Sequence, residues 1–170
     1  MKSTVIRYGL RSAITIIILF LLGWFLGKNL DFDFQEIIGY VSIVLSLLFV
    51  FFGIKHFRDR QNNGIISFGK AFLTGMLITL FASVAFGIID VIYTTYLNPN
   101  FTTEYYRQAS EQIHKAYSGV ELQEKIQAME NEKALFTNPL ISFLLMSFTV
   151  FLIGFIISTI SSLLLQRKRN

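Results

Sequence analysis

Residues 71–97 read AFLTGMLITLFASVAFGIIDVIYTTYL, an apolar stretch in which Asp90 is the single charged side chain. A helix needs about 20 apolar residues to cross the hydrocarbon core of a bilayer, which is roughly 30 Å thick. This stretch is long enough, and it has no polar face that would suit a helix on the surface of a soluble protein. The sequence therefore predicts a membrane-spanning helix at 71–97.

Three similar apolar stretches, at 8–29, 37–57 and 140–165, predict three more spans. The first follows basic residues, as a cleavable signal peptide would, but no small-residue cleavage site follows Gly27, so we interpret it as a retained signal anchor. The short connection after it predicts that the first two helices pair antiparallel. The expected fold class is all-α, a polytopic membrane protein with four transmembrane helices.

The composition excludes several classes of protein. Hydrophobic residues make up 53% of the 170 residues and charged residues only 15%, whereas soluble proteins carry roughly a quarter charged residues. The alternative of a soluble helical bundle is disfavoured because the apolar stretches offer no polar face to water. The sequence contains no cysteine, which excludes disulfides, thiolate metal sites and cysteine nucleophiles. We expect one membrane domain over residues 1–170.

Lysine and arginine are distributed unevenly among the gaps between the spans. One set of gaps carries Asp59 as its single acid and ten cations, namely Lys2, Arg7, Arg11, Lys55, Arg58, Arg60, Lys70, Arg167, Lys168 and Arg169. The other set carries nine acids and only five cations, namely Lys28, Arg107, Lys115, Lys125 and Lys133. Because basic residues near span ends favour the cytoplasmic side, both termini are predicted to be cytoplasmic. We expect the lipid bilayer as a partner, and no nucleic acid.

The segment 98–138 is the one sizeable polar region and is predicted to be extracytoplasmic. Tyr105, Ala109 and Ile113 recur at helical spacing, and Leu122 and Ile126 do so again after a Ser-Gly pair. We expect two amphipathic helices, or one broken helix, lying over the outer ends of the spans. A disordered loop is the alternative.

The third span also carries small residues at a strict spacing of four, namely Ala71, Gly75, Thr79, Ser83 and Gly87. Such a row lets another helix backbone approach closely. Matching rows occur on the fourth span, at Gly154, Ser158 and Ser162, and on the first, at Gly23 and Gly27. We interpret the rows as helix-packing seams, within one chain or between protomers of a homo-oligomer, and we expect the third helix to be central. A substrate path is the alternative.

Asp90 is the one charged side chain well inside a span, about seven residues before the end of its helix. A charge at the bilayer centre costs roughly 2.5 to 3.5 kcal/mol on insertion scales, so such residues are often functional. One hypothesis is a proton- or ion-coupling role. The other, which we favour, is a packing residue bonded to a neighbour such as Thr94 or paired with Lys28. A single carboxylate without a second intramembrane acid, histidine or arginine is a poor relay.

Residues for catalysis or metal binding are sparse. Glu111 and His114 have the E-x-x-H spacing of di-iron sites, but those sites need a second such motif and two further glutamates. The other histidine, His56, is predicted to lie on the opposite side of the membrane. We therefore predict no catalytic, cofactor-binding or metal-binding residues, and no enzymatic activity.

Three motifs give the chain a resemblance to a known family. Residues 53–59 (GIKHFRD) end the second span, residues 63–72 (NGIISFGKAF) open the third, and residues 97–101 (LNPNF) close it. In this order the motifs resemble the bacterial membrane proteins of domain-of-unknown-function family 4199. The resemblance implies a four-span protein of the bacterial inner membrane and carries no activity. The favoured hypothesis is a structural or accessory subunit with a membrane-protein partner, and the alternative is a small transporter or channel component using Asp90.

Overall fold

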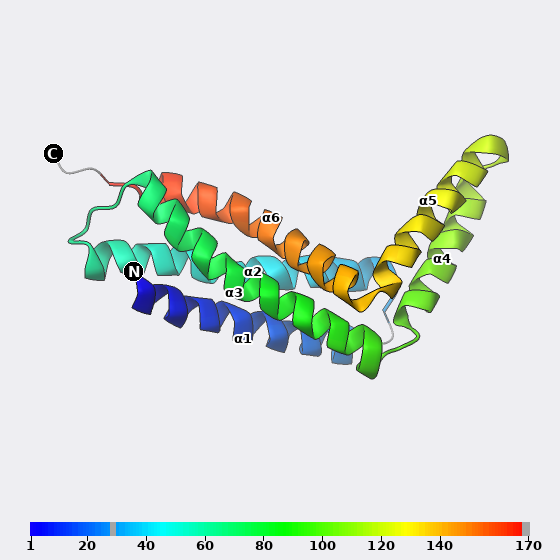
Figure 1. Ribbon diagram of the computed structural model, residues 1–170, viewed down its shortest axis with the longest axis horizontal. Coiled ribbons are helices and arrows are strands. Elements are labelled where there is room, and N and C mark those ends of the chain that lie inside the picture. Colours follow the sequence, from blue (N-terminus) through cyan, green and yellow to red (C-terminus); the bar gives the residue numbers. More distant parts are fainter. Residues whose placement is uncertain (28–29, 168–170) are drawn as a thin grey trace. The chain divides into compact units, whose positions relative to one another are not determined.

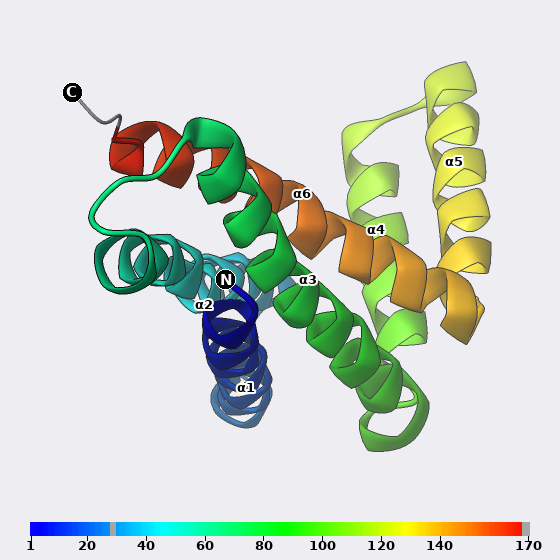
Figure 2. The ribbon, with the colours of Figure 1, turned by 60° about the vertical axis from the view of Figure 1, so that its left-hand side comes forward.

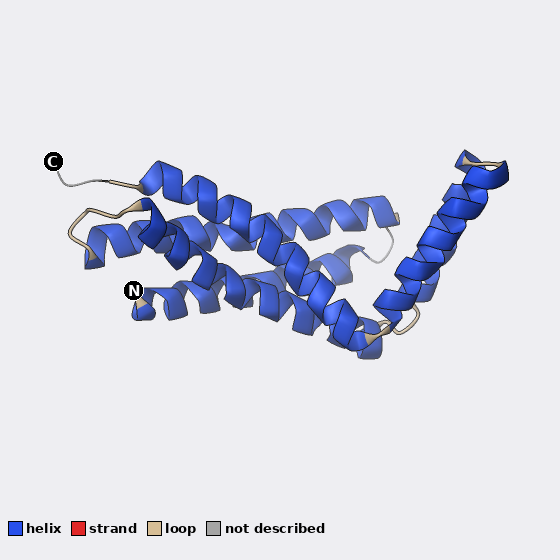
Figure 3. Ribbon diagram, turned by 45° about the horizontal axis from the view of Figure 1, so that its top comes forward, coloured by secondary structure: helices blue, strands red, loops and turns tan. Residues whose placement is uncertain are grey.

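The computed structural model describes residues 1–27 and 30–167, and nearly all of them are helical (Figure 3). In chain order the helices are α1 (Lys2–Gly27), α2 (Phe32–Gln61), α3 (Phe68–Ile92), the π-helix η1 (Tyr93–Leu97), α4 (Phe101–Ala116), α5 (Gly119–Thr137) and α6 (Pro139–Leu165) (Figure 1). Four of them are long and apolar enough to cross a membrane, namely α1, α2, α3 with its η1 extension, and α6. The predicted all-α fold with four spans is confirmed.

The helices extend beyond the apolar stretches that predicted them. The first was expected to start at residue 8 and starts at Lys2, and the second was expected over 37–57 and covers Phe32–Gln61. The apolar stretch predicts only the part of a helix that lies in hydrocarbon. The helical backbone hydrogen bonds continue beyond it into the charged residues at each end. The predicted end of the first span, at residues 28–29, lies outside the described residues.

The chain forms two compact units, residues 1–86 with 146–170 (unit 1) and residues 87–145 (unit 2). Both α3 and α6 contribute residues to each unit. The division therefore does not separate two complete sets of helices, and a single domain over 1–170 stays a prediction.

Unit 1 has a continuous apolar core supplied by all four of its helices. Its fully buried side chains include Ile16, Leu47, Ile54, Ile78 and Val150. The helices α1 and α2 pair antiparallel, as predicted, and the buried Ser12 hydroxyl donates a 2.7 Å hydrogen bond to the Ser46 carbonyl across this pair. Figure 1 places the N-terminus, the α2–α3 connection and the C-terminal end of α6 at the same end of unit 1.

The outside of unit 1 is apolar along the length of its helices. On α1, for example, large side chains recur every four residues and are between 41% and 55% exposed, namely Ile6, Leu10, Ile14, Ile18 and Leu22. Contiguous apolar patches of this size are rare on soluble monomers. The surface suits hydrocarbon as its solvent.

Unit 2 contains the end of α3, the start of α6 and an antiparallel pair of helices, α4 and α5 (Figure 2). The prediction of two helices in the 98–138 segment is confirmed, and the disordered-loop alternative is wrong. Gly119 begins α5 at φ +63°, a left-handed conformation that favours glycine. The placement of this pair over the ends of the spans stays a prediction.

Tyr106 and Met129 are the buried residues of the α4–α5 pair among its described residues. The Tyr106 hydroxyl donates a 3.2 Å hydrogen bond to Glu132 Oε1 on the facing helix. Burial, together with the neighbouring Glu132 carboxylate, raises the pKa of the Tyr106 phenol above its ordinary value of about 10. The phenol is therefore protonated at neutral pH and available as the donor that joins the two helices.

Candidate functional site

The carboxylate of Asp90 is the centre of the candidate site. Asp90 lies two residues before the end of α3 and is 8% exposed. Its Oδ2 accepts a 2.9 Å hydrogen bond from the hydroxyl of Ser142 on α6, and both residues belong to unit 2. Within the described part of the chain Asp90 forms no ion pair.

The start of α6 explains how Ser142 reaches this position. Asn138 precedes the helix, and its side-chain Oδ1 accepts hydrogen bonds from the backbone N–H groups of Leu140 (3.0 Å) and Ile141 (3.3 Å). Pro139 occupies the first helical position, where its missing N–H costs nothing. Ser142 thus lies in the first turns of α6, and the partial positive charge of a helix N-terminus favours a nearby carboxylate.

The predicted partners of Asp90 need correction. Thr94 does hydrogen-bond Asp90, as expected, but its hydroxyl donates to the main-chain carbonyl of Asp90 at 3.0 Å and not to the carboxylate. Lys28, the other expected partner, lies outside the described residues. Ser142 was missed because it is 52 residues away. The sequence did contain a usable signal. Asp90 lies a few residues before the end of the third span and Ser142 a few residues after the start of the fourth, so antiparallel spans place both at a similar depth.

A π-helical turn, Tyr93–Leu97, begins three residues after Asp90. The Asn98 N–H donates to the Tyr93 carbonyl at 2.7 Å, which closes the wider turn of a π-helix. The Asn98 side-chain Nδ2 also donates to the Tyr93 hydroxyl at 3.0 Å, and the ring of Phe101 contacts Tyr93 at 5.2 Å between centroids. The LNPNF motif therefore ends the third span in a π turn, a feature often found at functional sites.

The described surface near Asp90 is apolar. A shallow depression of about 330 Å³ is lined by Ile88, Val91, Ile92, Pro139, Leu140 and Phe143. Asp90 is not among its lining residues, because the exposed Ile88 and Ile92 lie on another face of α3. This depression offers no polar route to the carboxylate.

Asp90 can therefore hold a proton or accept hydrogen bonds, and its charge acts on the Tyr93 phenol one turn later. It forms no ion pair with any described side chain. Groups of three or more metal-ligating side chains are absent from residues 1–27 and 30–167. On α4, Glu111 pairs with Arg107 at 2.6 Å, and His114 Nδ1 lies 2.7 Å from the Ser110 carbonyl oxygen. Both side chains of the E-x-x-H spacing thus engage partners on their own exposed helix.

The predicted seams of α3 and α6 face each other in unit 1. A β-carbon added at Gly75 would lie 2.8 Å from Ser158 Oγ, and one added at Gly154 would overlap the side chain of Thr79. The hydroxyl oxygens of Thr79 and Ser158 are 3.4 Å apart. The two helices approach so closely at this level that glycine on one accommodates a hydroxyl-bearing residue on the other.

The remaining seam residues fall into two groups. Ser83 and Gly87 of α3 are buried, whereas Gly23 and Gly27 of α1 face α2. Ser83 is 2% exposed, and its hydroxyl donates to the Leu80 carbonyl of its own helix at 3.1 Å. Gly87 is buried in unit 2. On α1, a β-carbon at Gly23 would lie 3.1 Å from Ile38 and one at Gly27 would lie 3.7 Å from Gln35, so both face the start of α2.

Two further glycines bring α1 and α2 against α3, and neither was predicted to lie at a helix contact. A β-carbon at Gly9 would lie 2.6 Å from the ring of Phe81, and one at Gly53 would overlap Ile78. Glycine contacts therefore join α3 to each of α1, α2 and α6. In agreement, 50% of the most apolar window of α3 is buried, against 17% for α1 and for α6.

Comparison with known proteins gives one match. The model of a family described as protein of unknown function (DUF4199) matches residues 7–167. No curated protein and no solved structure matches the chain.

Proposed function

The chain belongs to the DUF4199 family of proteins of unknown function, and from that premise we propose that it is a non-enzymatic integral membrane protein acting as a structural or accessory subunit. One observation carries the proposal: the intramembrane carboxylate is buried and bonded to a hydroxyl of a neighbouring helix. A side chain held in this way contributes to helix packing.

The interlocked seams of α3 and α6 support the same role. Where glycine on one helix meets Thr79 or Ser158 on the other, the space between the two helices is filled by side chains. Small residues in membrane helices commonly serve close packing. Such a contact leaves no room for a substrate to pass between α3 and α6 at this level, which argues against a path along the seam.

We place the protein in the bacterial inner membrane with both termini in the cytoplasm. Support comes from unit 1, where the start of α1, the α2–α3 connection and the end of α6 lie together (Figure 1). These segments and the residues next to them carry all of the described basic residues of unit 1. The start of α2, at the other end of that helix, carries Asp31, Asp33 and Glu36 instead. The positive-inside rule assigns the basic end to the cytoplasm.

Reporter fusions test this orientation. Reporters that are active only in the cytoplasm should be active at Met1 and at Asn170, and one inserted at Ser118 between α4 and α5 should be inactive. A reporter that is active only outside the cytoplasm should give the opposite pattern at all three positions. Termini found on different sides of the membrane would contradict the four-span topology, and a consistent inversion would contradict the orientation.

The α4–α5 pair is then extracytoplasmic and is the surface we propose for a membrane-protein partner. The pair buries only Tyr106 and Met129 among its described residues, while Val120 at its turn is 73% exposed. A two-helix pair with so small a core of its own gains stability from a further contact. Within the proposal this contact is with the partner or with a second copy of the chain.

The alternative function is a small transporter or channel component that uses Asp90. It is favoured by the burial of a carboxylate that has one hydroxyl donor and no ion pair in the described chain, and by the π turn that begins three residues later. Intramembrane acids are common in proton and ion pathways. Against the alternative, Asp90 forms no ion pair among the described residues, and the titratable group its charge acts on is the phenol of Tyr93 rather than a second acid or a base.

Proton flux into proteoliposomes distinguishes the two functions. We expect vesicles that contain the wild-type chain, the Asp90→Asn variant or no protein to show the same internal pH response to an external acid pulse, measured with a trapped fluorescent pH indicator. Repeating the measurement with an imposed sodium or potassium gradient extends it to coupled transport. Flux that is present in the wild type and lost in Asp90→Asn would establish the transport alternative and overturn the proposal.

A further inference from the structure

The basic residues of unit 1 gather at one end of its helices. The basic end consists of the first eleven residues, the end of α2, the α2–α3 connection, the first turn of α3, and the end of α6 with the two residues that follow it. Its one described acid is Asp59, and its described cations are Lys2, Arg7, Arg11, Lys55, Arg58, Arg60, Lys70 and Arg167. This excess of positive charge has no counterpart elsewhere in the described part of unit 1.

Hydrogen bonds hold these segments together. The Met1 amino group donates to Gln61 Oε1 at 3.1 Å, which joins the start of α1 to the end of α2. Ile66 and Arg167 exchange two backbone hydrogen bonds, of 3.0 and 2.8 Å, as an isolated antiparallel bridge. The backbone of Arg167 is therefore fixed against the α2–α3 connection, although its side chain is exposed.

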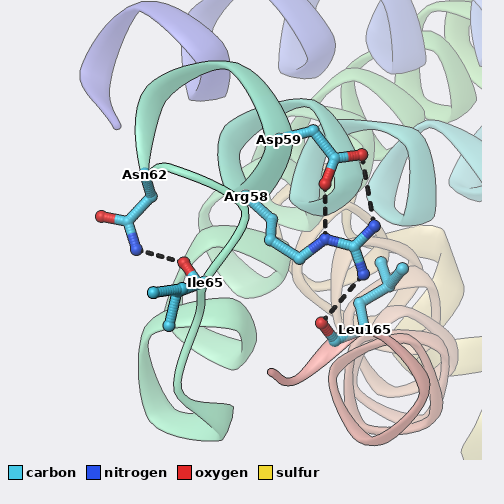
Figure 4. A network of polar contacts seen from close by, with 5 residues as sticks. All are labelled: Arg58, Asp59, Asn62, Ile65 and Leu165. Atoms are coloured by element: carbon cyan, nitrogen blue, oxygen red, sulfur yellow. Dashed lines mark hydrogen bonds and ion pairs between the residues drawn. The ribbon is translucent and has the colours of Figure 1, made fainter. Parts of the chain in front are cut away.

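Arg58 already has its acceptors (Figure 4). Its Nε and Nη2 donate to the two oxygens of Asp59, at 2.6 and 3.2 Å, and its Nη1 donates to the Leu165 carbonyl at the end of α6, at 3.2 Å. The only described carboxylate of the basic end is thus occupied by a bidentate pair. Arg58 thus binds a free carbonyl at the end of α6, and most of its N–H donors are already used.

Lys55 and Arg167 complete the cluster around Asp59. Both side chains are exposed, and the positive charges of both act on the Asp59 carboxylate. Since Arg58 neutralises that carboxylate, the cluster retains an excess of two positive charges. A phosphate group offers what the cluster lacks, a negative charge with several acceptor oxygens.

The surroundings of the cluster favour a lipid phosphate over a free one. The end of α6 exposes Leu163 and Leu164, at 55% and 70%, immediately before the residues that bridge to Ile66. A basic group beside exposed leucines matches the two parts of a phospholipid, an anionic headgroup and an acyl chain. This step rests on the proposed function: if the four helices span a membrane, the cluster at their basic end lies at the level of the lipid headgroups.

We propose that the basic end of unit 1 binds the phosphate of an anionic phospholipid, with Lys55 and Arg167 as its direct contacts and the acyl chain along the exposed leucines of α6. Arg58 acts as a positioning residue that holds the end of α6 beside α2. The bound lipid then joins α2 to α6 through its headgroup, in addition to the Ile66–Arg167 bridge.

Titration of the purified full-length chain in zwitterionic detergent tests the proposal. The probes are dioctanoyl-phosphatidylglycerol, dioctanoyl-phosphatidylcholine and glycerol phosphate, with bound lipid counted by native mass spectrometry. Because each cation near an anionic surface adds about fivefold to lipid affinity, we expect the phosphatidylglycerol to bind at least tenfold tighter than the other two probes. Its binding should weaken as salt is added.

Variants with a matched loss of charge complete the test. The double variant Lys55→Gln/Arg167→Gln should lose about 25-fold in phosphatidylglycerol affinity, about fivefold for each cation removed. The control Lys115→Gln/Lys125→Gln, which removes two exposed cations from α4 and α5, should stay within twofold of the wild type. The single variants, each with unchanged helical content and lipid-free thermal midpoint, should lose an intermediate amount.

Three results would overturn the proposal: equal affinity for both phospholipids, glycerol phosphate binding as tightly as phosphatidylglycerol, or an equal loss in the control variant. The second would reassign the cluster to a free phosphate. The measurement in detergent depends neither on the orientation of the chain nor on whether it transports ions. Its failure is therefore distinguishable from failure of the proposed function.

Discussion

Replacing Gly154 with leucine is expected to separate α3 from α6 in unit 1 and to destabilise the chain by about 3 kcal/mol or more. Even a single β-carbon at this position would overlap the side chain of Thr79, and overpacking a close contact typically costs about 1 to 3 kcal/mol and occasionally more. Gly154→Ala should cost less, because only one added carbon must be accommodated. Equilibrium unfolding in detergent micelles, followed by helical circular dichroism, measures both effects.

The chain offers a matched control and a rescue for this prediction. A β-carbon at Gly39 of α2 would meet nothing within 4 Å, so Gly39→Leu should change stability by less than about 0.5 kcal/mol, as surface substitutions usually do. Combining Gly154→Ala with Thr79→Ala removes the overlapping atoms and should restore part of the lost stability. Additive costs in that double variant, or equal costs for Gly154→Leu and Gly39→Leu, would refute the seam contact.

Replacing Ser142 with alanine is expected to cost about 1 to 3 kcal/mol, because it leaves the buried Asp90 carboxylate without the hydroxyl that bonds it. The same micellar unfolding experiment applies, with hydrogen exchange of the α6 amides reporting the local effect. Ser147→Ala is the matched control on the same helix. The Ser147 hydroxyl is buried but has no hydrogen-bond partner among the described residues, so its removal should cost little.

A double-mutant cycle separates the hydrogen bond from other effects at this position. If Asp90→Leu is combined with Ser142→Ala, both polar groups are removed and the double variant should be more stable than the sum of the single effects predicts. Asp90→Asn alone should be tolerated better than Asp90→Leu, since an amide oxygen can still accept from Ser142. Equal costs for Ser142→Ala and Ser147→Ala would show that the 2.9 Å contact does not hold α6 to α3.

The helices and their seams were predictable because each is encoded locally. Twenty or more apolar residues predict a span whatever its neighbours are, and small residues every fourth position predict a smooth face on one helix. Both features are periodic within a single stretch, so they need no knowledge of the fold. The row of Gly75 and Thr79 on α3 and the row of Gly154 and Ser158 on α6 were both recognised in this way.

Contacts between distant segments were not predictable to the same degree. A span that is apolar on every side does not reveal which face turns toward its neighbours, so the contacts of Gly9 with Phe81 and of Gly53 with Ile78 had no signal in the sequence. The same limit applies to Ser142, one of several serines on α6. Thr94 was chosen as the partner of Asp90 because it is one turn away, but a threonine hydroxyl at that spacing commonly bonds the backbone carbonyl instead.

The hydrogen-bond partners of the polar side chains of α3 become available at different stages of synthesis. Thr74 and Ser83 donate to carbonyls of their own helix, those of Lys70 and Leu80. These two hydroxyl groups therefore have their partners as soon as α3 forms. Asp90 is different, because its donor lies 52 residues later, a delay of about 3 to 10 s at ordinary elongation rates. During that interval the nascent third helix contains an acid whose donor has not yet been synthesised, so the Asp90 carboxylate gains this hydrogen bond only when α6 arrives.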